Sequence, residues 1–158
     1  TVTDTRTIDN DKSGGILVNK IKEADHNLID RKICKDNKDD IVVILKDWLK
    51  NKKIDAIITT GGTGLTGRDI TPEALDEIAD KHIPGFGEMF RYISIKSVGT
   101  SSIQSRACAV LSNGKYVFAL PGSSGGVTDA WDEILKYQLD INHKPCNFVE
   151  LFPRLKEK

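Results

Sequence analysis

The feature that most constrains this chain is a short apolar segment that breaks into glycine. Residues 54–58 read Ile-Asp-Ala-Ile-Ile, and after two threonines glycine occupies positions 61, 62, 64 and 67. A short apolar run bounded by a turn is typical of a strand that is buried on both faces. Glycine lets backbone N–H groups approach a ligand closely, and a run of free amides forms an anion-binding concavity. The stretch therefore predicts a strand whose C-terminal end carries a phosphate site.

The same glycines allow other interpretations, of which the simplest is a plain tight turn. Gly62, Gly64 and Gly67 also satisfy G-x-G-x-x-G, but that dinucleotide fingerprint needs its third glycine to open the helix. Here we expect the helix to begin later, with Thr71 as N-cap and Pro72 as the first helical residue. No Lys-Ser or Lys-Thr pair follows the glycines, so the pattern is not a Walker P-loop.

Length and charge limit the class of protein. The chain has 158 residues, enough for one domain over residues 1–158 with a sizeable core. Its 23 basic and 23 acidic residues cancel, so nothing in the charge suggests nucleic acid or an anionic membrane as a partner. There is no apolar run of membrane length and no signal-like opening. Residues 1–4 resemble the end of a strand, so we expect that strand to begin upstream of Thr1.

Three cysteines, at positions 34, 108 and 146, are odd in number and far apart. This spacing fits neither a disulfide framework nor a set of metal ligands, and it favours a reducing, cytoplasmic setting. Cys108 alternates with apolar neighbours and is expected to be a small buried side chain. The histidines at 26, 82 and 143 show no ligand spacing and are interpreted as structural or surface residues.

Strand and helix patterns alternate along the chain. Residues 28–34, 107–111 and 116–120 are expected to be strands, the last two joined by the hairpin turn Asn113-Gly114. Apolar residues at helical spacing predict a helix capped by Ser13, and further helices over residues 37–50, from Pro72 to His82, over 86–93 and over 127–139. On the fourth of these, Phe86, Met89 and Phe90 are expected in the core.

This order predicts an α/β fold of three layers, in which a mainly parallel sheet is flanked by helices and carries an antiparallel hairpin at its edge. Such sheets bind ligands at the carboxyl ends of their strands. We therefore expect residues 4–15, Asp36, residues 61–69 and residues 121–126 to meet at one edge.

The polar residues in these loops also have structural interpretations. Asp69 precedes a helix, where an acidic residue often only complements the helix dipole, and Asp36 is placed to cap the helix that follows it. Ser13, Ser105 and the run after Gly122 could be ordinary turn residues. Sequence position alone does not decide between a structural and a functional role for these residues.

Five motifs are spaced along the chain: residues 60–64 (TGGTG), 68–74 (RDITPEA), 85–91 (GFGEMFR), 105–106 (SR) and 120–123 (LPGS). Together they closely resemble the molybdopterin-binding family of molybdenum cofactor biosynthesis proteins. The resemblance runs in order from Asp4 to about residue 151. After Pro121-Gly122 the sequence departs from the family, which commonly has another proline or a lysine there. The resemblance implies the same fold, and a trimer or a dimer of trimers.

The resemblance also implies roles for individual residues. Asp36 and Asp69 would be catalytic and would hold Mg²⁺. Molybdopterin would contact Thr60, Gly61, Gly62, Thr63, Gly64, Thr71, Pro72, Glu73 and Ser105. The nucleotide would contact Asp4, Ser13, Gly14, Pro121, Gly122 and Ser123.

A carboxylate beside a phosphate site needs a physical reason. Two unit charges about 4 Å apart near a protein surface interact by roughly 4 kcal/mol, so an aspartate beside a triphosphate is costly without a cation between them. Mg²⁺ suits that place because it prefers one or two carboxylates together with phosphate oxygens and water.

The activity that the resemblance implies is Mg²⁺-dependent adenylylation of molybdopterin by ATP, which gives adenylyl-molybdopterin and pyrophosphate. The expected partners are molybdopterin, ATP, further copies of the chain and other molybdenum cofactor biosynthesis proteins. A molybdopterin-binding protein without catalysis, and a nucleotide pyrophosphate hydrolase on the same fold, are the alternatives.

Overall fold

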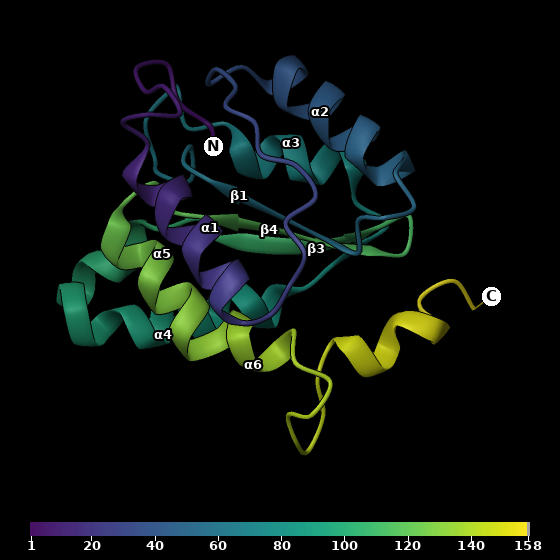
Figure 1. The fold of residues 1–158 in the computed structure, drawn as a ribbon. Coiled ribbons are helices and arrows are strands. Elements are labelled where there is room, and N and C mark those ends of the chain that lie inside the picture. The colour runs from purple at the N-terminus through teal and green to yellow at the C-terminus, as the bar shows by residue number, and fades with distance from the viewer. Residues whose placement is uncertain (158) are drawn as a thin grey trace.

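Helices cover both faces of a central sheet in the computed structural model, which describes residues 1–157 (Figure 1). Within these residues the sheet has four strands in the order β1-β4-β3-β2. The strands are β1 (Ala56–Thr60), β2 (Lys81–His82), β3 (Cys108–Ser112) and β4 (Lys115–Leu120). The α-helices are α1 (Lys12–Glu23), α2 (Lys38–Lys50), α3 (Thr71–Ile78), α4 (Pro84–Val98), α5 (Ser124–Ala130) and α6 (Lys136–Gln138). A π-helical turn (Trp131–Leu135) joins α5 to α6, and 3₁₀ segments span Gly99–Gln104 and Val149–Arg154.

The sheet is mixed. β1 pairs with β4 in parallel, whereas β3 pairs antiparallel with both β4 and β2. The hairpin turn has positive φ at Asn113 (49°) and Gly114 (71°), as its sequence predicted. The α/β fold with flanking helices and a hairpin is therefore confirmed. Two parts of the expected sheet differ: only the pair of β1 and β4 is parallel, and the hairpin of β3 and β4 lies at the centre of the sheet and not at its edge.

The strand predicted for residues 28–34 is wrong. Among the described residues, this segment joins the sheet only at Cys34, which bridges in parallel to Val2. Val2 in turn donates its N–H to the carbonyl oxygen of Thr60, at 2.9 Å. Residues of this segment and of β1 line a cavity of about 620 Å³. The two backbones are separated there, so apolar character alone could not make this segment a strand.

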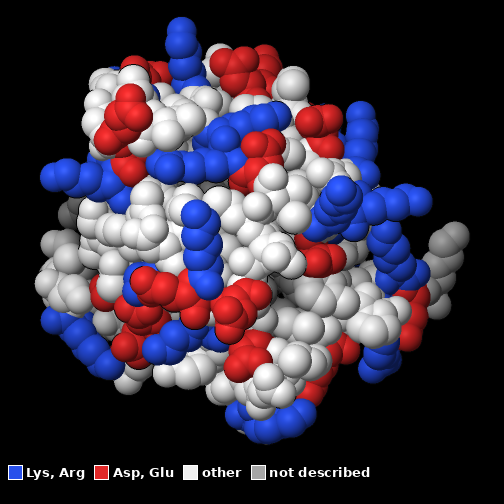
Figure 2. Space-filling model, viewed as in Figure 1, with Lys and Arg blue, Asp and Glu red and all other residues white. Residues whose placement is uncertain are grey.

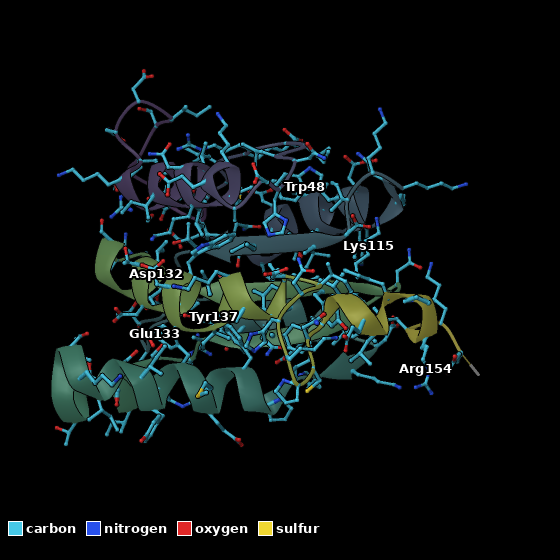
Figure 3. All side chains as sticks on the ribbon, turned by 60° about the horizontal axis from the view of Figure 1, so that its bottom comes forward. Trp48, Lys115, Asp132, Glu133, Tyr137 and Arg154 are labelled. Atoms are coloured by element: carbon cyan, nitrogen blue, oxygen red, sulfur yellow. The ribbon has the colours of Figure 1, made fainter. Side chains whose placement is uncertain are left out.

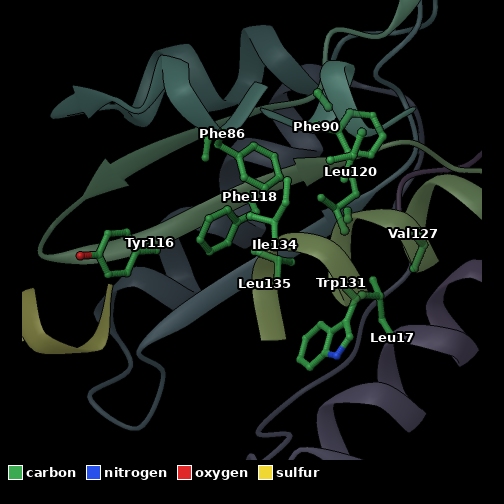
Figure 4. Packing of buried hydrophobic residues seen from close by; sticks show 14 of the residues in the cluster. Leu17, Phe86, Phe90, Tyr116, Phe118, Leu120, Val127, Trp131, Ile134 and Leu135 are labelled. Atoms are coloured by element: carbon green, nitrogen blue, oxygen red, sulfur yellow. The ribbon is translucent and has the colours of Figure 1, made fainter. Parts of the chain in front are cut away.

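The two faces of the sheet carry different cores. Along β4, Tyr116, Phe118 and Leu120 face α1, α4 and α5, and Phe118 packs against Phe86 with 5.2 Å between ring centroids (Figure 4). The alternate residues Val117 and Ala119 pack with the buried side chains of α2 and α3. This alternation places one helical layer on each side, as in Figure 1.

Core predictions for α4 are confirmed at two positions and wrong at one. Phe86 and Phe90 are buried, but Met89 is 50% exposed because the helix turns it toward solvent. Cys108 is half-buried, and burial raises the pKa of its thiol to about 11.

Some predicted helix ends also differ from the structure. Asp11, not Ser13, caps α1, and its side chain accepts a hydrogen bond from the N–H of Gly14. Ile70 precedes α3, so Thr71 is the first helical residue instead of its cap. His82 lies in β2, because the backbone becomes extended at Ala79 and then pairs with β3.

Lys115 ties the start of β4 to the end of α2 (Figure 3). Its ammonium group donates hydrogen bonds to the carbonyl oxygens of Asn51 and Trp48, and burial lowers the pKa of this lysine.

Basic and acidic side chains are interspersed on the face seen in Figure 2, and the net charge of the chain is zero. None of the helices in residues 1–157 combines the length and the apolar character needed to cross a bilayer.

Candidate functional site

A cavity of about 610 Å³ lies where β1 and β4 end. The glycine loop follows β1, and the turn at Pro121 and Gly122 follows β4. Because these strands are parallel, both loops emerge at the same edge of the sheet. Residues 2–6, Asp36 and residues 104–105 complete the wall. The loops that the sequence predicted to meet do meet here.

The glycine loop depends on glycine at two positions. Gly61 has φ 104° and Gly62 has φ 66°, a backbone conformation that other residues rarely adopt. A Cβ at Gly61 would clash with the carbonyl oxygen of Val2, and one at Gly62 would clash with the hydroxyl of Thr71. Thr71 fastens the loop to α3, since its N–H donates to the oxygen of Gly62 and its hydroxyl to that of Gly61.

The loop also presents unused donors. The N–H groups of Gly62 and Thr63 donate to no acceptor within residues 1–157. Gly62 is half-buried and Thr63 is buried, so these amides are held in place beside the cavity. Free amides in a fixed turn suit an anion such as a phosphate.

Asp36 belongs to the cavity and not to the helix that follows it. Asn37 caps α2 by accepting a hydrogen bond from the N–H of Asp40, which excludes the capping role for Asp36. The N–H of Asp36 donates to a carboxylate oxygen of Asp4 at 3.2 Å. Burial and the negative charge of Asp4 raise the pKa of Asp36. In the folded chain this carboxylate is ionised at a cost that a nearby cation would relieve.

Asp69 has the opposite electrostatics. Its Oδ2 accepts hydrogen bonds from the N–H and the hydroxyl of Thr66, at 2.9 and 2.6 Å. Burial raises the pKa of Asp69, but the hydrogen bonds from Thr66, one from the backbone of Gly64 and the charge of Arg106 together lower it more, so the net shift is downward. The same cavity therefore holds two carboxylates of different character. The protein stabilises the charged form of Asp69 but not that of Asp36.

The structure divides the residues predicted for the site. Those on the cavity wall are Asp4, Asp36, Gly61, Gly62, Thr63, Gly64, Asp69, Ser105, Pro121, Gly122 and Ser123. The others do not line it: Thr60, Thr71, Pro72, Glu73, Ser13 and Gly14. Apart from Pro72, which has neither a polar side chain nor an N–H group, each of them makes a hydrogen bond within the protein. Thr60, for example, donates its hydroxyl to the oxygen of Pro121. These residues support the loops instead of lining the cavity.

Sequence reasoning missed the arginines of the cavity. Arg6 donates hydrogen bonds to the hydroxyl of Ser13 and the carbonyl oxygen of Gly122, at 3.1 and 3.3 Å. Arg68 lies 3.8 Å from a carboxylate oxygen of Asp4. Both arginines line the cavity, as do Thr3, Thr5, Thr66 and Gln104. In the sequence, Arg6 is two positions from Asp4 and Arg68 is next to Asp69. This closeness to predicted site residues could have indicated that the arginines belong to the cavity.

Comparison with known proteins identifies the family of this chain. A family model described as a probable molybdopterin-binding domain matches residues 2–141. The chain belongs to this family of molybdenum cofactor biosynthesis domains.

Relatives and solved structures agree with this family. Molybdenum cofactor biosynthesis protein B of Escherichia coli K12 is 40% identical over 157 residues, which cover 99% of this chain and 91% of the relative. The protein of the same name from Staphylococcus aureus COL is 43% identical over 143 residues, covering 89% and 84%. A crystal structure of molybdenum cofactor biosynthesis protein B superposes with a TM-score of 0.88 at 37% identity, covering 99% of this chain and 92% of the other. The tungsten cofactor synthesizing protein MoaB of Pyrococcus furiosus gives 0.78 at 34% identity, covering 87% and 88%.

Proposed function

We propose that this chain transfers the adenylyl group of ATP to molybdopterin in a Mg²⁺-dependent step of molybdenum cofactor biosynthesis. A terminal phosphate oxygen of molybdopterin attacks the α-phosphorus of ATP, a new P–O bond forms, and the bond to the β-phosphate oxygen breaks to release pyrophosphate. The observation that carries this proposal is the joining of free loop amides and two differently tuned aspartates in one cavity.

The glycine loop would bind the pterin phosphate. Hydrogen bonds to charged groups contribute roughly 1.5–3 kcal/mol each, so the amides of Gly62 and Thr63 can provide substantial affinity. Arg6 and the loop at Gly122 and Ser123 would face the nucleotide on the opposite wall. The protein then contributes mainly by positioning the two phosphates for in-line transfer.

A divalent metal fits the donor chemistry of this site. No group of three or more His, Cys, Asp or Glu in residues 1–157 is arranged to hold a metal by itself. Mg²⁺ needs only one or two carboxylates when substrate phosphates and water complete its shell. Asp36 and Asp69 are the residues that would hold it, and burial and the negative charge of Asp4 raise the pKa of Asp36, so a bound cation would favour its charged form. When bound, Mg²⁺ supplies charge neutralisation to the triphosphate.

Covalent catalysis finds no support near the cavity. Burial raises the pKa of the Cys108 thiol to about 11, so it would be a poor nucleophile at neutral pH. Among the cysteines, Cys34 and Cys108 are half-buried and Cys146 is exposed, and none lines the described cavity. Free thiols scattered in this way also support a cytoplasmic setting.

The decisive experiment incubates the protein with molybdopterin, ATP and Mg²⁺ and separates the products by mass spectrometry. We expect adenylylated pterin and pyrophosphate in equal amounts, and neither product when Mg²⁺ is chelated. Tight pterin binding without either product would support the non-catalytic binder and contradict the proposal. Nucleotide hydrolysis that does not depend on pterin would support the hydrolase instead.

We also propose that the chain assembles with itself, as a trimer or a dimer of trimers, and that it meets other proteins of the same pathway. Apolar side chains exposed on α4 and the following 3₁₀ segment support self-association, since large exposed apolar patches mark interfaces. They are Met89, Tyr92, Ile95, Val98 and Ile103, each at least 50% exposed. Sedimentation at micromolar concentration should show an oligomer that Tyr92→Glu weakens and Val43→Glu, on α2, leaves intact. A monomeric wild-type protein would contradict this assembly.

A further inference from the structure

Arg106 joins both ends of the glycine loop to α3. Its backbone N–H donates to the oxygen of Thr63 at 2.8 Å, and its Nε donates to the oxygen of Gly64 at 2.7 Å. Nη2 donates to the backbone oxygen of Asp69 at 2.6 Å, and Nη1 forms an ion pair with Glu73. A single residue thus contacts the start of the loop, its end and the helix beyond it.

These contacts control groups that face the cavity. The contact with Thr63 comes from the backbone of Arg106, whereas the contacts with Gly64 and Asp69 come from its guanidinium. Gly64 and Asp69 both line the cavity. Holding the backbone oxygen of Asp69 fixes the backbone position from which its carboxylate projects. Arg106 does not itself line the cavity. It acts on the site through the backbone.

Glu73 holds the arginine from the other side. Its Oε1 pairs with Nη1 of Arg106, and this contact lowers the pKa of Glu73. The resemblance to the family implied contact between Glu73 and molybdopterin, but in the structure this carboxylate is engaged with Arg106 behind the loop. A guanidinium can donate to Gly64, Asp69 and Glu73 at the same time, because its five N–H donors form a rigid, planar fork.

We propose that Arg106, anchored by Glu73, is a positioning residue whose guanidinium holds Gly64 and Asp69 in place on the cavity wall for a substrate phosphate. The inference rests on the proposed function of the cavity. It requires only that the cavity bind the pterin phosphate, so it can be tested without any turnover.

The test compares Arg106→Lys with Arg91→Lys. Arg91 is the matched control because its guanidinium donates to the carbonyl oxygens of Ser105 and Ala107, on either side of Arg106, and to none in the glycine loop. For each variant, calorimetry gives the affinity for molybdopterin, and amide hydrogen exchange gives the protection of residues 63–69. All measurements are made well below the melting temperature of the least stable variant.

We expect Arg106→Lys to weaken pterin binding about tenfold or more, since small misplacements of positioning groups have effects of that order or larger. Residues 63–69 should exchange faster in the same variant. Arg91→Lys should change the affinity less than about twofold even if it lowers the melting temperature. Glu73→Gln, which keeps the shape of the anchor, should give a smaller loss in the same direction as Arg106→Lys, and it covers the case in which that variant fails to fold.

Unchanged affinity and unchanged exchange in Arg106→Lys would overturn the inference, as would an equal loss in Arg91→Lys. If Arg106→Lys does not fold, Glu73→Gln with wild-type affinity and exchange would overturn it. Failure of adenylyl transfer in the wild-type protein would instead count against the proposed function, because neither readout depends on that reaction.

Discussion

Gly64 and Asp69 are packed so closely that a Cβ on the glycine would stand 2.8 Å from Oδ2 of the carboxylate. That same oxygen accepts the hydrogen bonds from Thr66. Unlike Gly61 and Gly62, Gly64 has no positive φ. Glycine is therefore needed at this position because a side chain would displace the Asp69 carboxylate, and not because the backbone conformation requires it.

Replacing Gly64 with alanine should move the Asp69 carboxylate with little backbone strain. We expect adenylyl transfer to fall about tenfold or more, because displacement of a positioned group by a fraction of an ångström is sufficient for that. The melting temperature should change little. Gly67→Ala is the control, since a Cβ there meets nothing within 4 Å. Steady-state kinetics should be measured on both variants. An equal loss of activity in Gly64→Ala and Gly67→Ala would show that the loss does not come from displacement of the Asp69 carboxylate.

Asp36 should reduce the stability of the metal-free protein at neutral pH. Burial and Asp4 raise its pKa above the ordinary 3.8, so folding favours the protonated form. Any stability that this preference contributes is present below pH 3.8 and is lost as the pH rises through the folded value. Without Mg²⁺, Asp36→Asn should therefore melt at or above the wild-type temperature near neutral pH. Thermal melts from about pH 3 to 8 measure the difference, and a clearly less stable variant at neutral pH would argue against this electrostatic account.

Asp11 should have the opposite effect. Its carboxylate is fully buried; burial raises its pKa, but hydrogen bonds from Thr1, Gly14, Arg31 and Ser13 outweigh this and lower the pKa to about 2. The stability it provides is present above 3.8, is lost as the pH falls toward 2, and corresponds to about 2 kcal/mol.

The test for Asp11 is acid unfolding followed by circular dichroism. Asp11→Asn should be less stable than the wild type near neutral pH, and the difference should shrink between pH 4 and pH 2. A constant difference over that range would show that the lost stability does not come from ionisation of this carboxylate.

The sequence predicted the features that depend on neighbouring residues. The expected helix 37–50 differs from α2 by one residue, because its apolar spacing and the cap Asn37 are local. The hairpin and the meeting of the loops were likewise correct. The strand over residues 28–34 was wrong because strand pairing needs a partner from a distant part of the chain. The pairing of Glu73 with Arg106 was missed for the same reason, since 33 positions separate them.

The replacement that best separates an enzyme from a binding protein is Asp69→Asn. The amide keeps an oxygen that can accept the hydrogen bonds of Thr66, so the loop should hold its shape, but the charge that would hold a metal is lost. Pterin affinity should persist, because the free amides of Gly62 and Thr63 are unchanged. Turnover should fall by orders of magnitude, since loss of an interaction made mainly in the transition state lowers kcat and kcat/KM together.

The control for Asp69→Asn is Asp80→Asn, because Asp80 also accepts a backbone N–H, that of Asn113, far from the cavity. This variant should bind pterin and turn over normally. If Asp69 serves only as a charge near a helix terminus, its replacement should cost at most about 1 kcal/mol of stability and leave turnover intact. Melting temperature, pterin affinity and turnover on one preparation distinguish these cases. Undiminished turnover in Asp69→Asn would refute the catalytic assignment, because that variant lacks the negative charge that would hold the metal.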